Sequence, residues 1–497
     1  MSRFDAESAP ALIESAYWFE TNDAPLLHHA LTLADLAYIL HLDEQNLIPH
    51  LAAQELLRAL LELDQDPQFS YNPQYGDAFT NRERWLDGRA PSAVGYLAAG
   101  RARRESTSVA FRLVLRRELL RLARALLDLQ QTLIERAACH VETVMPDYTY
   151  LQQAQPTTFA HYILSFVFPL QRDFVRLRET FERVNQSPAG IGSTNGTRLP
   201  IRRERLAELL GFDSVILHTR DAMWQVDVPI QTINAAATLM IHLDRWAEDL
   251  QIFNSREFDF VELSDEVARA SIIMPQKKNP YPLAFIRGAA NALMGRVTEA
   301  YAGARTPSAQ VDNRIVLHGS VPRALDLTTR CVELMNAVCS TLTVHADKMR
   351  QQVEAGFTQA MDLAEVLMQE CALDYRTAHQ IVARVVRPLA NENKSARDIT
   401  PALLDNAAKE IIGRPLHLSQ TSLTTALDLN QAIAARNGIG GASPSRVQEM
   451  LHDLRADLEL QRTWLNETTA RIQTAEGALL AIENLSRAKS RDRKSEI

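Results

Sequence analysis

Apolar residues recur every three or four positions along several long stretches of this chain. The stretch from Glu105 to Met145 contains neither glycine nor proline, the residues that most often interrupt a helix. Because this spacing is typical of an α-helix that buries one face, we predict a long helix here. Its apolar stripe consists of Val114, Leu119, Leu120, Leu122, Leu126, Leu127, Leu129, Leu133 and Ile134.

Two further stretches, 230–274 and 323–354, show the same period and also lack glycine and proline. Stripes this wide need partners to cover them, so the long helices predict a central bundle. We expect three domains: an N-terminal helical domain over 1–105, the bundle domain over 106–355 and a C-terminal helical domain over 356–497. The charged tail from about residue 487 has little to bury and is expected to be disordered.

Composition supports an all-α fold and narrows the partners. The chain has only 18 glycines in 497 residues, well below the usual share of about 7%, whereas 46% of its residues are hydrophobic. A net charge of -8 offers no broad basic surface for nucleic acid or an anionic membrane, so a small-molecule or protein partner is the better default. No signal core opens the chain and no uncharged run approaches about 18 residues, so we expect a soluble cytoplasmic protein.

The segment 270–280, ASIIMPQKKNP, carries the clearest candidate chemistry. Its two prolines disfavour helix and hold the interval as a loop. Lys277 is a point charge suited to a carboxylate or phosphate, and Asn279 can donate hydrogen bonds to the same anion. Ser271 is a possible nucleophile or base if nearby donors and positive charge lower its proton affinity. Taken alone, these residues fit a solvated surface loop equally well.

A second loop, 187–197, reads SPAGIGSTNGT, and its amides and hydroxyls could meet an anion. It is not a phosphate-binding P-loop, because no Gly-Lys-Ser/Thr follows and no strand is predicted before it. An ordinary structural turn is the favoured alternative.

Several motifs together resemble one enzyme family. ASIIMPQKKNP resembles the G-S-S-x-M-P-x-K-x-N-P signature of the fumarase/aspartase superfamily, and EFDFVELSD at 257–265 is similar to argininosuccinate lyases in particular. MPDYTYLQQAQP at 145–156 resembles that family's MPGYTHLQRAQP. The likeness extends from about residue 75 to residue 460, and further matching segments are 196–212, 242–250, 355–367 and 435–441.

The resemblance implies a three-domain, almost all-α chain whose central helices form a twenty-helix bundle in a homotetramer. Each active site in such families is assembled from three subunits. The shared reaction is a reversible β-elimination that releases fumarate from a succinyl compound. A base removes the Cβ proton, negative charge spreads into the neighbouring carboxylate, and the C–N or C–O bond breaks. Neither a metal nor an organic cofactor is required.

The resemblance also implies roles for individual residues. Ser271 matches the first serine of the signature and would be the base. Lys277 and Asn279 match the residues that hold the carboxylate while charge accumulates on it.

Other matches imply substrate contacts in two further segments. Thr149 matches a substrate-binding threonine, and Gln155 in the same segment is also predicted to bind substrate. Arg103 aligns with the arginine of the family's GRSRND, and Arg104 replaces the asparagine that follows it. Arg104 could bind an extra anion, although a salt bridge to a nearby glutamate is an equally good prediction.

The chain departs from argininosuccinate lyase in the groups that handle the leaving group. The histidine of the family's T-H-x-Q is Tyr150 here, and the glutamate that supports this histidine aligns with Ala284. Both members of a relay pair are therefore absent together. Further departures are Phe79, Ala102, Val226, Ile272 and, in a loose alignment, Asp312 and Asn313.

We therefore predict a carbon–nitrogen lyase for a dicarboxylate-type substrate other than argininosuccinate. Tyr150 is a candidate proton donor, although a phenol with a pKa of about 10 is poorly matched to neutral pH, and it could equally fill the space of the lost imidazole. A leaving group stable as an anion, such as nitrite, would need no acid. The main alternative is an inactive homologue that keeps the tetramer as a structural or regulatory scaffold. His161, just after the hairpin motif, fits a packed or capping role better than catalysis.

Overall fold

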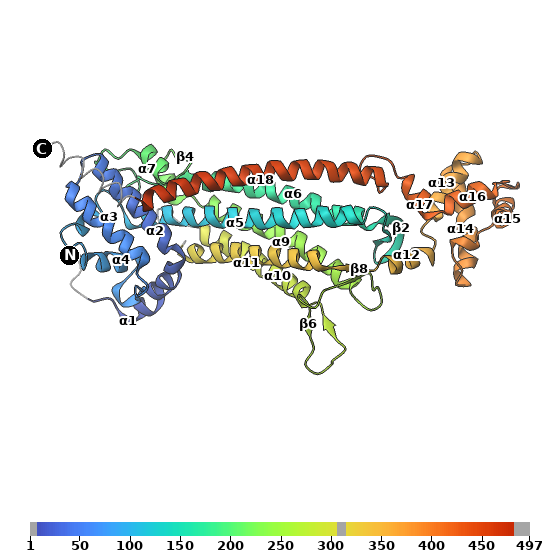
Figure 1. The fold of residues 1–497 in the computed structure, drawn as a ribbon, viewed down its shortest axis with the longest axis horizontal. Coiled ribbons are helices and arrows are strands. Elements are labelled where there is room, and N and C mark those ends of the chain that lie inside the picture. Colours follow the sequence, from blue (N-terminus) through green and yellow to red (C-terminus); the bar gives the residue numbers. More distant parts are fainter. Residues whose placement is uncertain (1–6, 306–314, 482–497) are drawn as a thin grey trace.

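The structure is a computed structural model that describes residues 7–305 and 315–481. These residues form an elongated, mainly helical molecule (Figure 1). A group of N-terminal helices lies at one end, long helices fill the middle and a smaller helical group lies at the other end. The predicted all-α class is confirmed, and the strands of the described chain form only short two-stranded pairs. None of the described helices is long and apolar enough to cross a membrane.

The N-terminal part is joined to the bundle by a buried charge network. Asp35 accepts hydrogen bonds from Arg82 at 2.9 Å, Arg101 at 2.6 Å and Ser106 at 3.1 Å, and all four side chains are buried. The network connects α2 (Trp18–Glu44), α4 (Ala78–Asp87) and the start of α5 (Arg103–Cys139). The helices of this part are α1 (Pro10–Leu12), α2 (Trp18–Glu44), α3 (His50–Gln65) and α4 (Ala78–Asp87), with a π turn at Ile13–Tyr17 and 3-10 turns at Pro73–Tyr75 and Val94–Tyr96.

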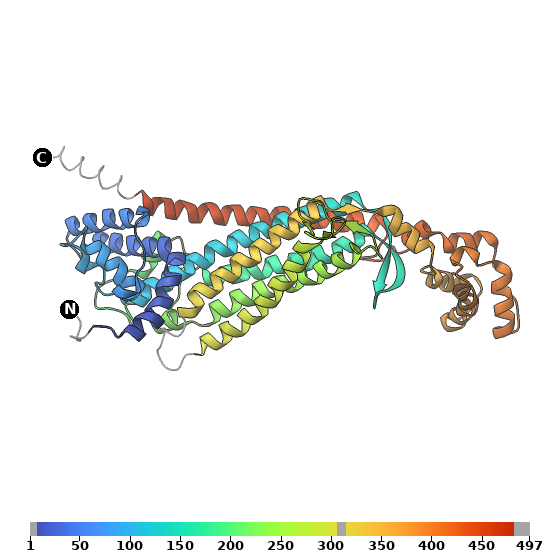
Figure 2. The ribbon, with the colours of Figure 1, turned by 90° about the horizontal axis from the view of Figure 1, so that it is seen from below.

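Long helices lie side by side in the central bundle in both views (Figures 1 and 2). Every position of the predicted apolar stripe between Val114 and Ile134 is buried, which confirms this helix. With 37 residues, α5 is about 55 Å long and runs the length of the bundle. The bundle helices are α5 (Arg103–Cys139), α6 (Phe159–Val184), α9 (Asp227–Phe253), α10 (Tyr281–Ala304), α11 (Ile315–Thr341) and α18 (Pro444–Leu480).

The helix predicted over 230–274 was wrong in its second half, because α9 ends at Phe253. The Asn254 side chain accepts a hydrogen bond from the backbone of Leu263 at 3.2 Å and so stabilises a turn. Asp259 adopts a left-handed conformation, with φ 52°, which lets the chain fold back. Phe260 is thereby buried against Phe253, with ring centroids 5.4 Å apart. Packing between Phe253 and Phe260 therefore favours the turn over continuation of the α9 helix.

The helix predicted over 323–354 is also interrupted. It consists of α11 and α12 (Ala346–Glu354), separated by the short strand β8 (Thr343–Val344), which pairs antiparallel with β5 (Val261–Glu262). The β-branched residues at this point favour the extended backbone that the pairing needs.

The C-terminal helices have a hydrophobic core of their own, which includes Leu363, Ile381 and Leu404. We expected the whole of 356–497 to form one domain, but α18 leaves this group and runs back along α5 (Figure 1). The tail from about residue 487 lies outside the described residues. The helices of this group are α13 (Ala360–Glu370), α14 (Tyr375–Asn391), α15 (Pro401–Ile412), α16 (Gln420–Leu427) and α17 (Leu429–Ala434), with a 3-10 turn at Ala396–Asp398.

Short elements connect the bundle helices and carry most of the candidate residues. Two antiparallel hairpins stand at separate places along the bundle: β1 (Val144–Thr149) with β2 (Gln152–Thr158), and β6 (Arg269–Ala270) with β7 (Lys278–Asn279). The remaining elements are the parallel pair β3 (Gln186–Ser187) and β4 (Ser214–Val215) and the helices α7 (Arg203–Leu209) and α8 (Thr219–Trp224).

Candidate active site

The signature segment forms the β6–β7 hairpin, whose loop projects from the side of the bundle (Figure 1). The base of the loop is closed by the Asn279 side-chain amide, which donates to the backbone oxygen of Arg269 at 2.9 Å. The backbone NH of Ser271 donates to the Lys277 oxygen at 3.3 Å and closes the loop two residues further on. Ser271, Lys277 and Asn279 are therefore held on one small element, although the Asn279 amide is used within it.

Ser271 is half-buried, and its hydroxyl oxygen accepts a hydrogen bond from the backbone NH of Met274 at 3.1 Å. A donor to this oxygen stabilises negative charge on it. Lys278 is bound by Glu262 at 2.9 Å and Asp265 at 2.7 Å. The adjacent Lys277 is exposed and forms no ion pair with any described residue, so its ammonium group is open to a substrate anion.

Tyr150 occupies the tip of the β1–β2 hairpin with its side chain 99% exposed. Tyr150 and Leu151 both have positive φ, 56° and 57°, as in a two-residue type I′ turn. Residues other than Gly, Asn and Asp adopt this conformation at a cost of roughly 1–2 kcal/mol each. Strain of this kind often marks a functional site. Tyr-Leu carries no hairpin-turn signal, so this turn could not be predicted from the sequence.

The other candidates of this hairpin lie on its two strands. Thr149 is exposed and pairs with Gln152 across the ladder. Gln155 lies further along β2, where its amide contacts the Met361 sulfur of α13 at 3.0 Å. The hairpin thus brings Thr149 and Tyr150 together at its tip and turns Gln155 toward the C-terminal helices.

Arg103 and Arg104 lie at the opposite end of α5. Arg103 pairs with Asp77 at the start of α4. Burial opposes ionisation of Asp77, but hydrogen bonds from the Thr80 backbone and the Arg103 guanidinium hold its pKa below the usual value. Arg104 binds both oxygens of Glu20, at 2.8 and 3.2 Å, so the predicted salt bridge is present.

The glycine-rich loop 187–197 is directed inward. The backbone NH of Gly190 donates to the buried Glu105 carboxyl at 2.7 Å, and the Gly192 oxygen accepts from the Ala102 backbone at 2.7 Å. Gly192 has φ +69°, and a Cβ there would lie 2.5 Å from the Gly196 oxygen. These contacts support the structural turn over an anion-binding loop.

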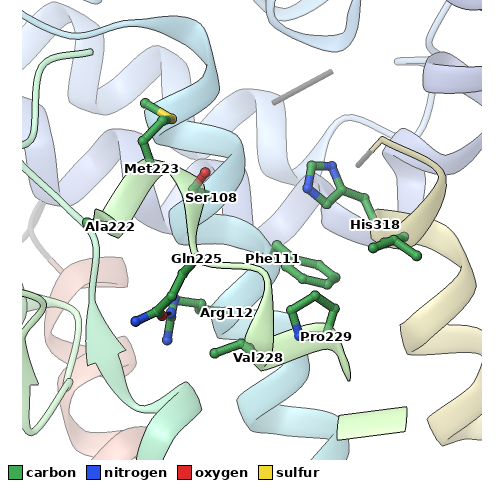
Figure 3. A pocket seen from close by; sticks show the side chains of 10 residues that line it. Ser108, Phe111, Arg112, Ala222, Met223, Gln225, Val228, Pro229 and His318 are labelled. Carbon is green, nitrogen blue, oxygen red and sulfur yellow. Dashed lines mark hydrogen bonds between the residues drawn. The ribbon is translucent and has the colours of Figure 1, made fainter. Parts of the chain in front are cut away.

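A cavity near the start of α9 is lined on that side by Gln225 and Val228, which stand on either side of the Val226–Asp227 segment (Figure 3). Ser108 and Phe111 of α5 and His318 of α11 contribute to its wall (Figure 3). Arg112 also reaches it, but its guanidinium donates to the oxygen of Val184 at 3.0 Å. The free volume of about 30 Å³ is room for a water molecule, so this cavity is too small for a substrate.

The remaining predicted positions have structural surroundings. His161 lies near Thr157 Oγ1 at 3.2 Å and the Gly440 oxygen at 3.1 Å, while its backbone NH bonds the capping hydroxyl of Thr158 at 3.2 Å. Phe79 packs on the main core. The predicted matches at 312–313 lie outside the described residues.

The candidate residues of one chain form separate groups. Arg103 stands at the first residue of α5, whereas the hairpin with Thr149 and Tyr150 follows its last turn, about 55 Å away. No small substrate can bridge this length. A single site that contains Arg103, Thr149 and Ser271 therefore requires more than one copy of the chain.

Known proteins match this chain over most of its length. A family model described as "Lyase" matches residues 14–295, and one described as "Argininosuccinate lyase C-terminal" matches 357–434. Argininosuccinate lyase of Methanoculleus marisnigri is 32% identical over 450 residues, which cover 89% of this chain and 90% of the relative. The enzyme of Methanosarcina acetivorans is 32% identical over 456 residues, covering 90% and 91%.

The chain belongs to the fumarase/aspartase superfamily, within its argininosuccinate lyase-like family. Solved structures agree. An EDDS lyase variant with bound fumarate has a TM-score of 0.86 and 27% identity, covering 98% of this chain and 97% of the other. The 3-carboxy-cis,cis-muconate lactonizing enzyme of Pseudomonas putida, with a TM-score of 0.69, 19% identity and coverage of 90% and 98%, shares the fold. The predicted family and the predicted carbon–nitrogen lyase class are confirmed.

Proposed function

We propose that this lyase cleaves the C–N bond of an N-substituted aspartate other than argininosuccinate and releases fumarate. One observation carries the proposal. Ser271, Lys277 and Asn279 are present together on one hairpin, whereas the relay pair for the leaving group is replaced by Tyr150 and Ala284. The similar EDDS lyase structure with bound fumarate supports the product.

The geometry of the loop supports Ser271 as the base. In the proposed reaction its oxygen takes the Cβ proton, and the C–H electron pair moves into the neighbouring carboxylate. The Met274 NH, 3.1 Å from the Ser271 oxygen, and the positive charge of Lys277 favour the deprotonated serine. Lys277 also stabilises the extra charge on the substrate carboxylate. The C=C bond forms as the C–N bond breaks, and the nitrogen leaves with a proton.

We further propose that the active protein is a homotetramer with sites shared between copies. The length of α5 separates candidate residues that must meet. Large apolar side chains also remain exposed along the bundle, as expected of a face that another copy covers. These side chains are Phe168 and Val175 on α6, Ile241 on α9, and Phe285, Met294 and Tyr301 on α10.

A substrate screen tests the activity. Purified protein is incubated with a panel of N-substituted aspartates and nitrosuccinate, and fumarate is followed by ultraviolet absorbance. We expect turnover of at least one N-substituted aspartate and a loss of at least about a thousandfold in kcat for Ser271→Ala. Ser340→Ala, at an exposed serine that bonds only its own helix, is the matched control and should retain full activity.

Three results would each contradict part of the proposal. If the wild type and Ser271→Ala are equally silent over the whole panel and no fumarate binding is measured by calorimetry, the chain is a non-catalytic scaffold. Efficient cleavage of argininosuccinate would instead refute the altered substrate. A sedimentation experiment that finds only monomers would refute the shared site.

A further inference from the structure

The stalk of the β6–β7 hairpin carries a double ion pair that has no part in the proposed chemistry (Figure 1). On β7, the Lys278 ammonium group binds the Glu262 carboxylate at 2.9 Å and the Asp265 carboxylate at 2.7 Å. Both carboxylates belong to the segment between α9 and β6. We call these three residues the Lys278 clasp. The clasp joins the strand that follows the signature loop to the segment that precedes the loop.

Glu262 is the fixed side of the clasp. It lies on β5, which pairs antiparallel with β8, and its neighbours Val261 and Leu263 are each 1% exposed. The side chain of Asp265, by contrast, is 95% exposed. Because buried neighbours and a paired strand hold Glu262, its carboxylate can restrain Lys278, whereas Asp265 adds charge from a more open position.

The hairpin needs such an anchor because its own ladder is short. Strands β6 and β7 contain two residues each, and an isolated two-stranded hairpin is marginally stable at best in water. The stalk is attached by the clasp and by the Arg269 guanidinium, which lies over the Tyr281 ring at 4.9 Å from its centroid. Exposed ion pairs contribute little to the stability of a whole protein. For an element of this size, however, two pairs on one lysine are a large part of what holds it.

Lys278 also bears on the direction of the residues used in the proposed reaction. Adjacent residues of an extended chain point to opposite sides. Because Lys278 is turned to the two carboxylates, Lys277 is turned away from them, in agreement with its exposure. The backbone NH of Ser271 donates to the Lys277 oxygen, so the orientation of Ser271 is coupled to that of the residue beside Lys278.

We propose that Lys278 is a positioning residue. Through the clasp it fixes the orientation in which the β6–β7 hairpin presents Ser271 and Lys277 to the substrate. The inference rests on the proposed function and adds a residue that touches neither the substrate nor the reacting atoms. Without the clasp, the groups for proton removal and carboxylate binding are still present, but on a hairpin that samples other orientations.

Kinetics of the wild type and Lys278→Met test this role, with the N-substituted aspartate that is turned over fastest in the fumarate assay. We expect kcat to fall at least about tenfold, because proton removal depends on the geometry of the base, while Tm is unchanged. With substrate deuterated at Cβ, the primary isotope effect should be larger for the variant, since proton removal becomes slower relative to the other steps. A mere loss of folded protein would not change the isotope effect. Lys278→Arg keeps the charge and should recover most of kcat.

Hydrogen exchange measures the hairpin without any substrate. In Lys278→Met, the amide hydrogens of residues 269–279 should exchange at least about fivefold faster than in the wild type, with no change in α5. Glu262→Gln removes the fixed side of the clasp, leaves the signature intact and should act in the same direction, more strongly than Asp265→Asn. The matched control is Lys394→Met, which removes an exposed ion pair in the C-terminal group and should change neither kcat nor hairpin exchange.

The possible failures are distinguishable. If the wild type releases fumarate and Lys278→Met matches it in kcat and in hairpin exchange, the positioning role is refuted while the proposed function stands. If kcat falls but the isotope effect and the exchange stay the same, the positioning role is also refuted. If no N-substituted aspartate releases fumarate, the proposed function falls, and the positioning role falls with it whatever the exchange shows.

Discussion

Glu105 offers a sharp test of how the start of α5 is held against the glycine-rich loop. Its side chain is 1% exposed and accepts the Gly190 backbone NH at 2.7 Å. Burial raises the pKa of this carboxyl to about 7, despite the favourable charges of Arg101 and Arg203. Glu105→Gln keeps the size of the side chain and the oxygen that accepts from Gly190, but removes the ionisable proton.

The size of the Glu105 contribution to the free energy of unfolding follows from the difference between its pKa values in the folded and unfolded chain. A rise from 4.5 to about 7 means that the folded protein binds the proton more tightly than the unfolded chain. The contribution of Glu105 to stability is therefore fully present below about pH 4.5 and is lost as the pH rises to about 7. At about 1.36 kcal/mol per pKa unit, the loss between pH 5 and pH 8 is between about 2 and 3 kcal/mol.

The assay is the free energy of unfolding from urea titrations of the wild type and Glu105→Gln at pH 5 and pH 8. Other groups titrate in both proteins, so the difference between the two isolates Glu105. We expect the variant to gain between about 2 and 3 kcal/mol relative to the wild type on going from pH 5 to pH 8. An equal difference at both pH values would refute the raised pKa and the buried, desolvated state from which it is argued.

Two further predictions concern the turn and the N-terminal network. Tyr150→Phe should leave stability unchanged, because the side chain is 99% exposed, but should lower kcat about a hundredfold if its phenol protonates the leaving amine. Retained activity in the fumarate assay would point to a leaving group that needs no acid. Asp35→Asn leaves the buried Arg82 and Arg101 without their counter-charge and should cost about 3–5 kcal/mol, seen as a lower Tm, and an unchanged Tm would contradict the network.

Periodicity predicted the helices whose whole apolar face is buried within the chain, and α5 is the clearest case. The periodicity did not predict where a helix ends when a side chain in the following turn stabilises that turn. Asn254 and Asp259 are tolerated in helices, so only their contacts with Leu263 and the aromatic cluster reveal that α9 stops at Phe253. The sequence likewise did not predict that α18 runs back along α5, because an amphipathic pattern shows that a helix face is buried but not which helix covers it.

Motifs predicted the candidate residues without predicting which of them meet. The spacing of Ser271 and Lys277 within one loop is local, so their proximity follows directly from the sequence. Arg103 and Thr149 are separated by a helix whose length becomes decisive only once it is seen to be straight and continuous.

The distribution of changes along the fold also bears on how the site could acquire a new substrate. The groups matched to proton removal and carboxylate binding share the β6–β7 hairpin, while the altered groups Tyr150 and Arg104 lie on other elements. If copies of the chain assemble the site, each group is contributed to it by a different element of the fold. A substitution on the β1–β2 hairpin can then reshape the leaving-group side without moving Ser271, because the two hairpins make no ladder with each other. Apart from Ile272, which lies in the β6–β7 loop beside Ser271, the division between retained and altered chemistry thus follows a physical division of the molecule.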